Sequence, residues 1–116
     1  MMTRSVDDLI KHGQLRIEEK ARVDLVAGQQ LSLVRVEMAA GVVEPAHTHP
    51  GIEVLYGLTG HGFVELDRTR RIPLAAGQAL VVEPGRVKAL GNDGAEPLAV
   101  LAVLALPEGQ PPFTAA

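Results

Sequence analysis

The stretch that decides the fold is GVVEPAHTHPGIEVLYGLTG, residues 41–60. It contains two histidines one residue apart, His47 and His49, and an acidic residue four positions later, Glu53. Successive side chains of a strand point to opposite faces, so we expect both histidines on the same face. A Pro-Gly pair predicts a turn before Glu53 opens an apolar strand. Two imidazoles and a carboxylate that lie together form a suitable ligand set for a divalent transition metal.

The chain on either side of this stretch is predicted to consist mainly of β-strands. Residues 16–27 alternate partly between polar and apolar, and residues 31–38 do so clearly. Further short apolar segments follow, separated by turn signals, and the last apolar run covers residues 97–106. Residues 3–13 instead predict a short helical turn, because Ser5 stands three positions before an acidic residue. Short strands with regular turns and little helix are typical of an all-β sandwich or barrel.

Length and composition limit the possible classes of protein. The chain has 116 residues, which predicts one domain over residues 1–116, with a core of about 15–106 and an extended tail at 107–116. It has no cysteine, which excludes disulfides and thiolate chemistry. A net charge of −3, no basic block and few aromatic residues argue against nucleic-acid binding. No apolar segment is long enough to span a bilayer, so we expect a cytoplasmic protein without membrane association.

The spacing within residues 41–60 resembles the first motif of the cupin superfamily. That motif reads G, five residues, H-x-H, three or four residues, E, six residues, G. The matching positions are Gly41, His47, His49, Glu53 and Gly60. The resemblance implies a small, single-domain jelly-roll barrel of two sheets, also called a double-stranded β-helix. In that family the polar residues of two motifs converge inside the barrel mouth.

A second stretch, GQALVVEPGRVKALGN at residues 77–92, resembles the second cupin motif in part. The positions that fit are Gly77, Gly85 and Asn92. Glu83 stands where the family has proline, and Lys88 stands where it usually has its last metal-binding histidine. The resemblance therefore implies that Lys88 faces the residues of the first motif, as a fourth member of the site.

One hypothesis for the site is a metal centre. His47, His49 and Glu53 supply three ligands and leave coordination positions open, as catalysis requires. Neutral imidazole and carboxylate do not select strongly among Fe, Ni, Mn, Zn and Cu, so the sequence does not name the metal. Against this hypothesis, Lys88 carries a positive charge at neutral pH and repels a dication.

Two other hypotheses give Lys88 the main role. In one, its ammonium group replaces the metal and pairs with Glu53, which leaves a vestigial or purely ligand-binding site. In the other, burial beside His47 and His49 lowers the pKa of Lys88 and makes it a base or an imine-forming nucleophile. The sequence leaves these alternatives open.

The cupin resemblance leaves the function equally open, because cupins include dioxygenases, isomerases, epimerases, lyases and decarboxylases. We expect a small-molecule ligand or substrate in a pocket with aliphatic walls. The candidate wall residues are Val34, Val36, Leu55, Val64, Leu80 and Val82. We also expect a homodimer, because small cupins commonly pair through their sheets and the aliphatic last strand predicts burial on both faces. An enzyme, a binding module and a structural protein with a vestigial site all remain possible.

Two further features are interpreted as surface. His12 lies in the polar leader, and alternation places His61 on the outward side of its strand, so neither is expected to bind a metal. Residues 67–71, DRTRR, bring three arginines together. We interpret them as a solvated hairpin tip, because nothing nearby in the sequence completes an anion site.

Overall fold

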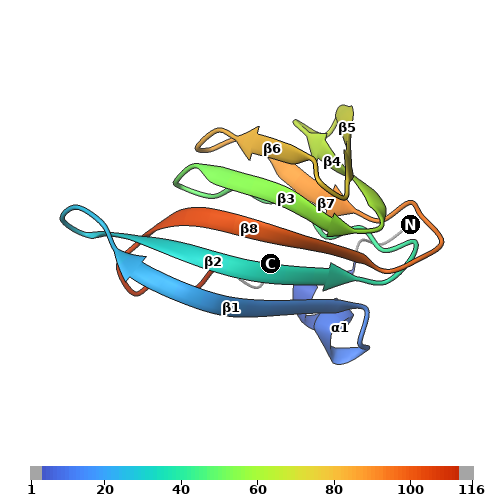
Figure 1. Ribbon diagram of the computed structural model, residues 1–116, viewed down its shortest axis with the longest axis horizontal. Coiled ribbons are helices and arrows are strands. Elements are labelled where there is room, and N and C mark those ends of the chain that lie inside the picture. The colour runs from blue at the N-terminus through green and yellow to red at the C-terminus, as the bar shows by residue number, and fades with distance from the viewer. Residues whose placement is uncertain (1–3, 113–116) are drawn as a thin grey trace.

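The computed structural model describes residues 4–112, which form one short helix and eight strands (Figure 1). The elements are α1 (Val6–Lys11), β1 (Leu15–Asp24), β2 (Gln29–Met38), β3 (Glu53–Thr59), β4 (His61–Leu66), β5 (Arg70–Ala75), β6 (Ala79–Val82), β7 (Lys88–Gly91) and β8 (Leu98–Pro107).

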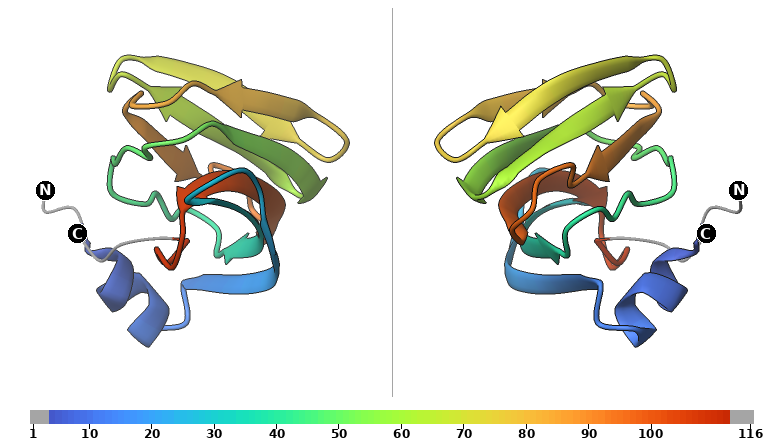
Figure 2. Two further views of the ribbon diagram at one scale, coloured as in Figure 1. Left: turned by 90° about the vertical axis from the view of Figure 1, so that its left-hand side faces the viewer. Right: turned by 90° about the vertical axis from the view of Figure 1, so that its right-hand side faces the viewer.

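The strands form two antiparallel sheets that face each other (Figure 2). The larger sheet has the order β1-β2-β8-β3-β6, and the smaller sheet has the order β5-β4-β7. Strands distant in sequence are neighbours, as in the pairing of β2 with β8 and of β3 with both β8 and β6. This arrangement confirms the expected all-β jelly roll.

The core lies between the two sheets and follows the alternation of the sequence. On β2, Val34, Val36 and Met38 are buried, while the residues between them are half-buried. The six aliphatic side chains proposed as pocket walls belong to this core: five are buried in it, and Leu80 packs against it. Each buried side chain of this size contributes roughly 1.5–3 kcal/mol to stability. These residues therefore pack the barrel interior.

The predicted N-terminal helical turn is confirmed as α1. The Ser5 hydroxyl accepts a hydrogen bond from the Asp8 backbone N–H at 3.1 Å, which caps the helix at its start. Val6 and Leu9 are buried in the core, so α1 packs against the barrel through one side. In residues 4–112, no helix is long and apolar enough to cross a membrane.

The last strand, β8, is buried on one face within the single chain, and the expected burial of its other face at a subunit contact stays a prediction. Its inward side chains from Val100 to Leu106 are buried, but the outward ones, such as Leu101 and Val103, are only half-buried. Within a single chain, the inner face of β8 is therefore covered, and its outer face is partly open from Leu101 onward. His12 and His61 are exposed, as expected.

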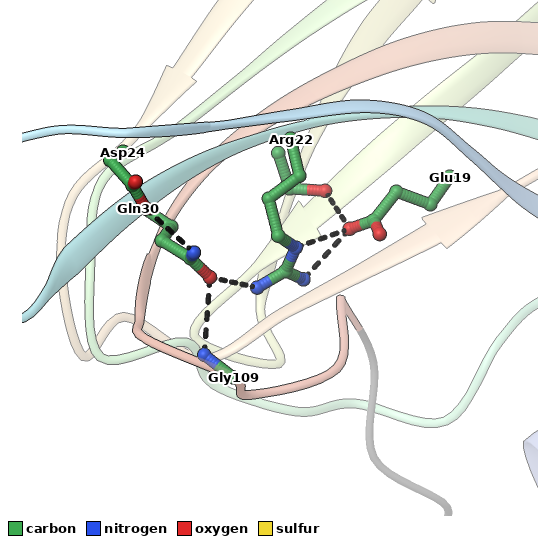
Figure 3. Close-up of polar contacts among 6 residues, drawn as sticks. Glu19, Arg22, Asp24, Gln30 and Gly109 are labelled. Atoms are coloured by element: carbon green, nitrogen blue, oxygen red, sulfur yellow. Dashed lines mark hydrogen bonds and ion pairs between the residues drawn. The ribbon is translucent and has the colours of Figure 1, made fainter.

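A polar network lies at the β1–β2 hairpin, which extends beyond the smaller sheet (Figures 1 and 3). The Glu19 carboxylate accepts hydrogen bonds from Nε and Nη2 of Arg22, at 2.9 and 2.7 Å, and from the buried Ser32 hydroxyl. Arg22 also donates to Gln30, whose side-chain oxygen accepts from the Gly109 N–H. The network connects β1, β2 and the segment that follows β8.

Candidate functional site

The first motif reaches the barrel interior through an irregular segment between β2 and β3. The expected strand around the histidines is reduced to two isolated bridges, which pair Val43 with Gly91 and His47 with Lys88. The second bridge has hydrogen bonds of 2.9 Å in both directions between the two backbones. The two sequence motifs therefore meet side by side, and His47 lies directly opposite Lys88.

The two histidines lie close together, as the sequence predicted. Their ring centroids are 4.9 Å apart, and the rings are nearly perpendicular. Nδ1 of His47 lies 2.9 Å from the Pro45 carbonyl oxygen, which can only accept a hydrogen bond. Nδ1 is therefore the protonated nitrogen, and Nε2 of neutral His47 is an acceptor. His49 is more deeply buried, and burial lowers its pKa, although the carboxylate of Glu53 acts in the opposite direction.

Glu53 is the first residue of β3, where it is paired with both β6 and β8. Only 3% of its side chain is exposed. Its Oε2 atom lies 3.8 Å from Nε2 of His49, and its Oε1 atom lies 3.0 Å from Nζ of Lys88. Oε1 accepts no hydrogen bond of good geometry. Its contact with Lys88 is therefore an ion pair in which the N–H donors of Nζ are not well aligned with the oxygen.

Lys88 has a second carboxylate partner, Glu44, which the sequence did not predict. Nζ of Lys88 lies 3.5 Å from Oε1 of Glu44, and this oxygen also accepts from the Leu90 backbone N–H at 2.8 Å. Nε2 of His47 lies 4.0 Å from the same atom. We name Glu44, His47, His49, Glu53 and Lys88 the barrel cluster. Lys88 lies between the two carboxylates, and each carboxylate has one histidine beside it.

The side-chain alternation explains why Glu44 was missed. In a regular strand, Glu44 would point to the face opposite His47 and His49, because its number has the other parity. The irregular segment breaks that alternation and turns Glu44 inward. A residue before proline is restricted to extended backbone, but this restriction does not show which face its side chain occupies.

The charge of Lys88 follows from these contacts. Burial alone would lower the pKa of Lys88, but the carboxylates of Glu44 and Glu53 outweigh this effect and raise its pKa. The expectation of a lowered pKa, on which an imine-forming or basic lysine depended, is therefore wrong. The sequence suggested that the imidazoles of His47 and His49 are the neighbours of Lys88, whereas the side chains nearest its Nζ atom are two carboxylates.

The barrel cluster does not fit a metal ion while Lys88 is in place. A transition metal requires oxygen and nitrogen ligands at about 2.0–2.2 Å, and the ammonium group takes the position beside Oε1 of Glu53 instead. In residues 4–112, no group of three His, Asp or Glu side chains is arranged to hold a metal ion. His47, His49 and Glu53 are thus brought together, but around a lysine.

Two hollows are present on the described surface. One, of about 570 Å³, lies near the C-terminal end of α1 and the start of β1. The other, of about 400 Å³, lies beside Arg4, Val43 and Arg68. His47, His49, Glu53 and Lys88 line neither of them. Glu44, another member of the barrel cluster, lines the second hollow.

Comparisons with known proteins agree with this fold. The Cupin domain family matches residues 34–104, which include both motifs and most of the large sheet. The chain therefore belongs to the cupin family.

Several solved structures resemble this one closely in fold. A Cupin 2 conserved barrel domain protein from Salinispora arenicola is 26% identical, with a TM-score of 0.62 over 78% of this chain and 74% of that chain. A conserved protein of unknown function from Streptococcus pyogenes is 25% identical, with a TM-score of 0.65 over 83% of this chain and 77% of that one. A Klebsiella pneumoniae protein with a double-stranded β-helix domain is 20% identical, with a TM-score of 0.72 over 100% and 97%. No curated protein sequence matches the chain.

Proposed function

We propose that this cupin binds a small organic ligand without a resident metal and without turning the ligand over. The single observation that carries the proposal is the position of Lys88, whose Nζ lies 3.0 Å from Glu53 and 3.5 Å from Glu44. An ammonium group there supplies the positive charge that a metal would otherwise supply to these carboxylates.

The charges of the barrel cluster support this proposal. Lys88 is 5% exposed, and a charge so deeply buried is stable only with paired countercharges, which Glu44 and Glu53 provide. Because its pKa is raised, Lys88 keeps its proton at neutral pH and is neither a metal ligand nor a nucleophile. The cluster thus has the groups for binding polar atoms, but lacks an activated group for chemistry.

His47 is the most exposed member of the barrel cluster. Its side chain is 28% exposed, compared with 11% or less for the other four. In the neutral form of His47, Nε2 is an acceptor, so a ligand with a hydroxyl or amide donor fits it. We expect binding to be detected as a ligand-dependent rise in Tm and as NMR shifts of the His47 ring, and His47→Ala to abolish both.

The decisive experiment measures metal content in protein purified without a histidine tag. We expect less than a tenth of an equivalent of transition metal in the native protein, and close to one equivalent in Lys88→His, where a third imidazole replaces the ammonium group and supplies the fourth ligand. Lys88→Met is the matched control, since it removes the charge without adding a ligand. About one equivalent in the native protein, lost in His47→Ala/His49→Ala, would refute the proposal.

That refuting outcome would support a second function, metal-assisted catalysis with His47, His49 and Glu53 as ligands. The proximity of these three side chains favours it, and the ammonium group of Lys88 opposes it. Catalysis through an imine at Lys88 is tested separately, by borohydride reduction in the presence of aldehydes and ketones. We expect no covalent adduct at Lys88 by mass spectrometry.

We also propose that the chain forms a homodimer through the outer face of the larger sheet. On this face Val54 pairs with Val81 and Val103, and Tyr56 pairs with Leu101. Tyr56 and Val81 are 44% and 54% exposed, so the row is apolar but uncovered. Apolar faces of this kind are self-complementary about a twofold axis.

Sedimentation velocity tests the dimer. We expect the native protein to sediment as a dimer and Val81→Lys as a monomer, because a charge placed in an apolar contact is costly. Val26→Lys is the control, since Val26 is also exposed but lies in the hairpin turn between β1 and β2. A native monomer would exclude this proposal.

A further inference from the structure

The geometry points to a second binding site, a hollow on the outer side of the smaller sheet that takes a small organic anion with an apolar portion. The hollow has a volume of about 400 Å³ and lies between the N-terminal segment, the chain that follows Gly41 and the β4–β5 hairpin. It is separate from the exposed edge of His47, and the proposal does not depend on the function proposed above.

The position of the hollow follows from the strand pairing. Glu65 of β4 and Ala89 of β7 are cross-strand partners, and both line the hollow. Because neighbouring residues of a strand point to opposite faces, Ala89 faces away from the interior into which Lys88 points. Ala89 and Glu65 therefore line the hollow from the outer face of the smaller sheet. The buried residues Leu9, Val42 and Glu44 line it as well, so the hollow lies at the edge of the barrel.

Part of the lining of the hollow is apolar, and we call this part its floor. The side chains that form it are Leu9, Val42, Val43, Ala46 and Ala89. Val43 is 42% exposed, although it is a large hydrophobic residue. A hollow of this volume falls within the range of about 300–1,000 Å³ that is typical of small-molecule sites. Its floor suits an alkyl or aryl group.

Two arginines from distant parts of the sequence line the same hollow, Arg4 and Arg68. Among residues 4–112, no carboxylate lies within ion-pair distance of either guanidinium group, although two neighbouring arginines have partners: Arg71 pairs with Glu65, and Arg86 with Asp67. Guanidinium groups bind carboxylates and phosphates through paired N–H donors. A ligand anion would supply the partner that these two arginines lack.

Arg4 is held at the hollow by its neighbours. Its guanidinium group donates to the side-chain oxygen of Gln14, which also lines the hollow, and lies 3.0 Å from Nδ1 of His12. These contacts restrict the side chain and still leave N–H donors for a ligand.

The acidic side chains that line the hollow do not cancel this charge. Glu44 is paired with Lys88 and accepts from a backbone N–H, and Glu65 is paired with Arg71. Glu44 shares Lys88 with Glu53, so this group keeps one negative charge, whereas Arg4 and Arg68 supply two positive charges, and the net charge around the hollow is positive. A hollow with positive groups at its edge and an apolar floor selects amphiphilic anions.

The backbone of the β4–β5 hairpin supports a role for Arg68. Asp67 and Arg68 have φ values of 53° and 61°, in the left-handed region that side chains other than glycine rarely adopt. A hydrogen bond of 3.1 Å from Thr69 N–H to the Leu66 carbonyl closes this two-residue turn. Asn-Gly would form the same turn with less strain. Strained residues of this kind cluster at binding sites, and here the strain places a guanidinium group beside the hollow.

This site changes the interpretation of the DRTRR segment. Its arginines were interpreted as a solvated tip because nothing nearby in the sequence completes an anion site. The structure supplies Arg4 and the apolar floor from other segments, which no local pattern shows.

The test is a titration of the full chain, followed by ¹H–¹⁵N NMR, with three probes: hexanoate, inorganic phosphate and hexylamine. We expect hexanoate to shift the amide signals of residues 42–44, 46, 65–68 and 89, phosphate to bind more weakly, and hexylamine to have no effect there. Arg68→Asn keeps a residue that tolerates left-handed backbone, and we expect it to raise the Kd for hexanoate by about tenfold. Arg4→Gln should have a similar effect.

Arg70→Asn is the matched control, because Arg70 is an exposed arginine of the same hairpin that does not line the hollow. It should change the Kd less than twofold. Equal effects of Arg68→Asn and Arg70→Asn, equal binding of hexanoate and hexylamine, or no localised shifts with hexanoate would each overturn the proposal. Unchanged amide spectra of the free variants elsewhere in the chain establish that they are folded. None of these outcomes depends on the metal content.

Discussion

The barrel cluster and the hairpin network of Glu19 and Arg22 are both built from charged side chains, but they satisfy those charges differently. Arg22 donates two hydrogen bonds to Glu19 and a third to Gln30, and its side chain is 20% exposed (Figure 3). Lys88 is 5% exposed, and its closest contact, Oε1 of Glu53, lacks an aligned hydrogen bond.

This difference separates structural from functional use of charge. A guanidinium group with several donors in a plane holds segments together, and the hairpin network does this for β1, β2 and the chain after β8. The barrel cluster instead buries one ammonium group and two carboxylates at a cost in desolvation that a packed apolar core would avoid. Retaining such a costly arrangement is consistent with a binding site.

The largest effect that we expect comes from removing the buried cation. Lys88→Met leaves two unpaired carboxylates in the interior and should lower the free energy of unfolding by about 3–5 kcal/mol. Urea denaturation followed by circular dichroism measures this change. The matched control is the triple variant Lys88→Met/Glu44→Gln/Glu53→Gln, which should recover at least half of the loss. A loss below about 1 kcal/mol in Lys88→Met would show that the cluster is far more hydrated than the exposed fractions indicate.

A smaller effect is expected in the hairpin network. Arg22→Met removes three hydrogen bonds, but the groups are partly exposed and water can replace the guanidinium group. We expect a loss of about 1 kcal/mol in the same urea measurement. A loss as large as that of Lys88→Met would remove the distinction between the two regions.

The two regions should also differ in the pH range over which they stabilise the fold. Lys88 has a raised pKa, so its contribution is complete below its ordinary value of 10.5 and is lost as pH rises through the higher folded value. Hydrogen bonds from Arg22 and Ser32 lower the pKa of Glu19, so its contribution is present above 4.5 and is lost as pH falls through the lower folded value.

Thermal unfolding from pH 3 to pH 12 checks this assignment. Lys88→Met should reduce the fall in Tm at alkaline pH, and Glu19→Gln should reduce the fall in Tm at acid pH. The opposite pattern would contradict the signs given above.

The smallest expected difference is in the response to salt. Double-mutant cycles for Glu19 with Arg22 should lose a few tenths of a kcal/mol of coupling between 0.1 and 1 M NaCl, because exposed charges are screened. The cycle for Lys88 with Glu53 should change less, since ions do not enter a buried site. Equal salt dependence in both cycles would show that solvent reaches Lys88.

Local patterns predicted several elements because those elements depend on local geometry. The alternation of residues 31–38 predicted which side chains of β2 are buried, and the spacing of Ser5 predicted the start of α1. Prediction was incomplete where the pattern is irregular. The segment that carries His47 is not a regular strand, so alternation does not place Glu44 inside the barrel.

The sequence by itself determined the fold class and which residues come together. The spacing of glycine and histidine resembles the cupin motifs, and this resemblance implied a jelly roll in which His47, His49 and Glu53 face Lys88, while period-2 alternation placed the two histidines on one face. Only the tertiary structure decided the charge of the site, by placing Glu44 beside Lys88 and raising its pKa. It also joined Arg4 to Arg68 in one hollow. Pairing and burial of charges depend on distances between segments far apart in the chain, and no local pattern contains those distances.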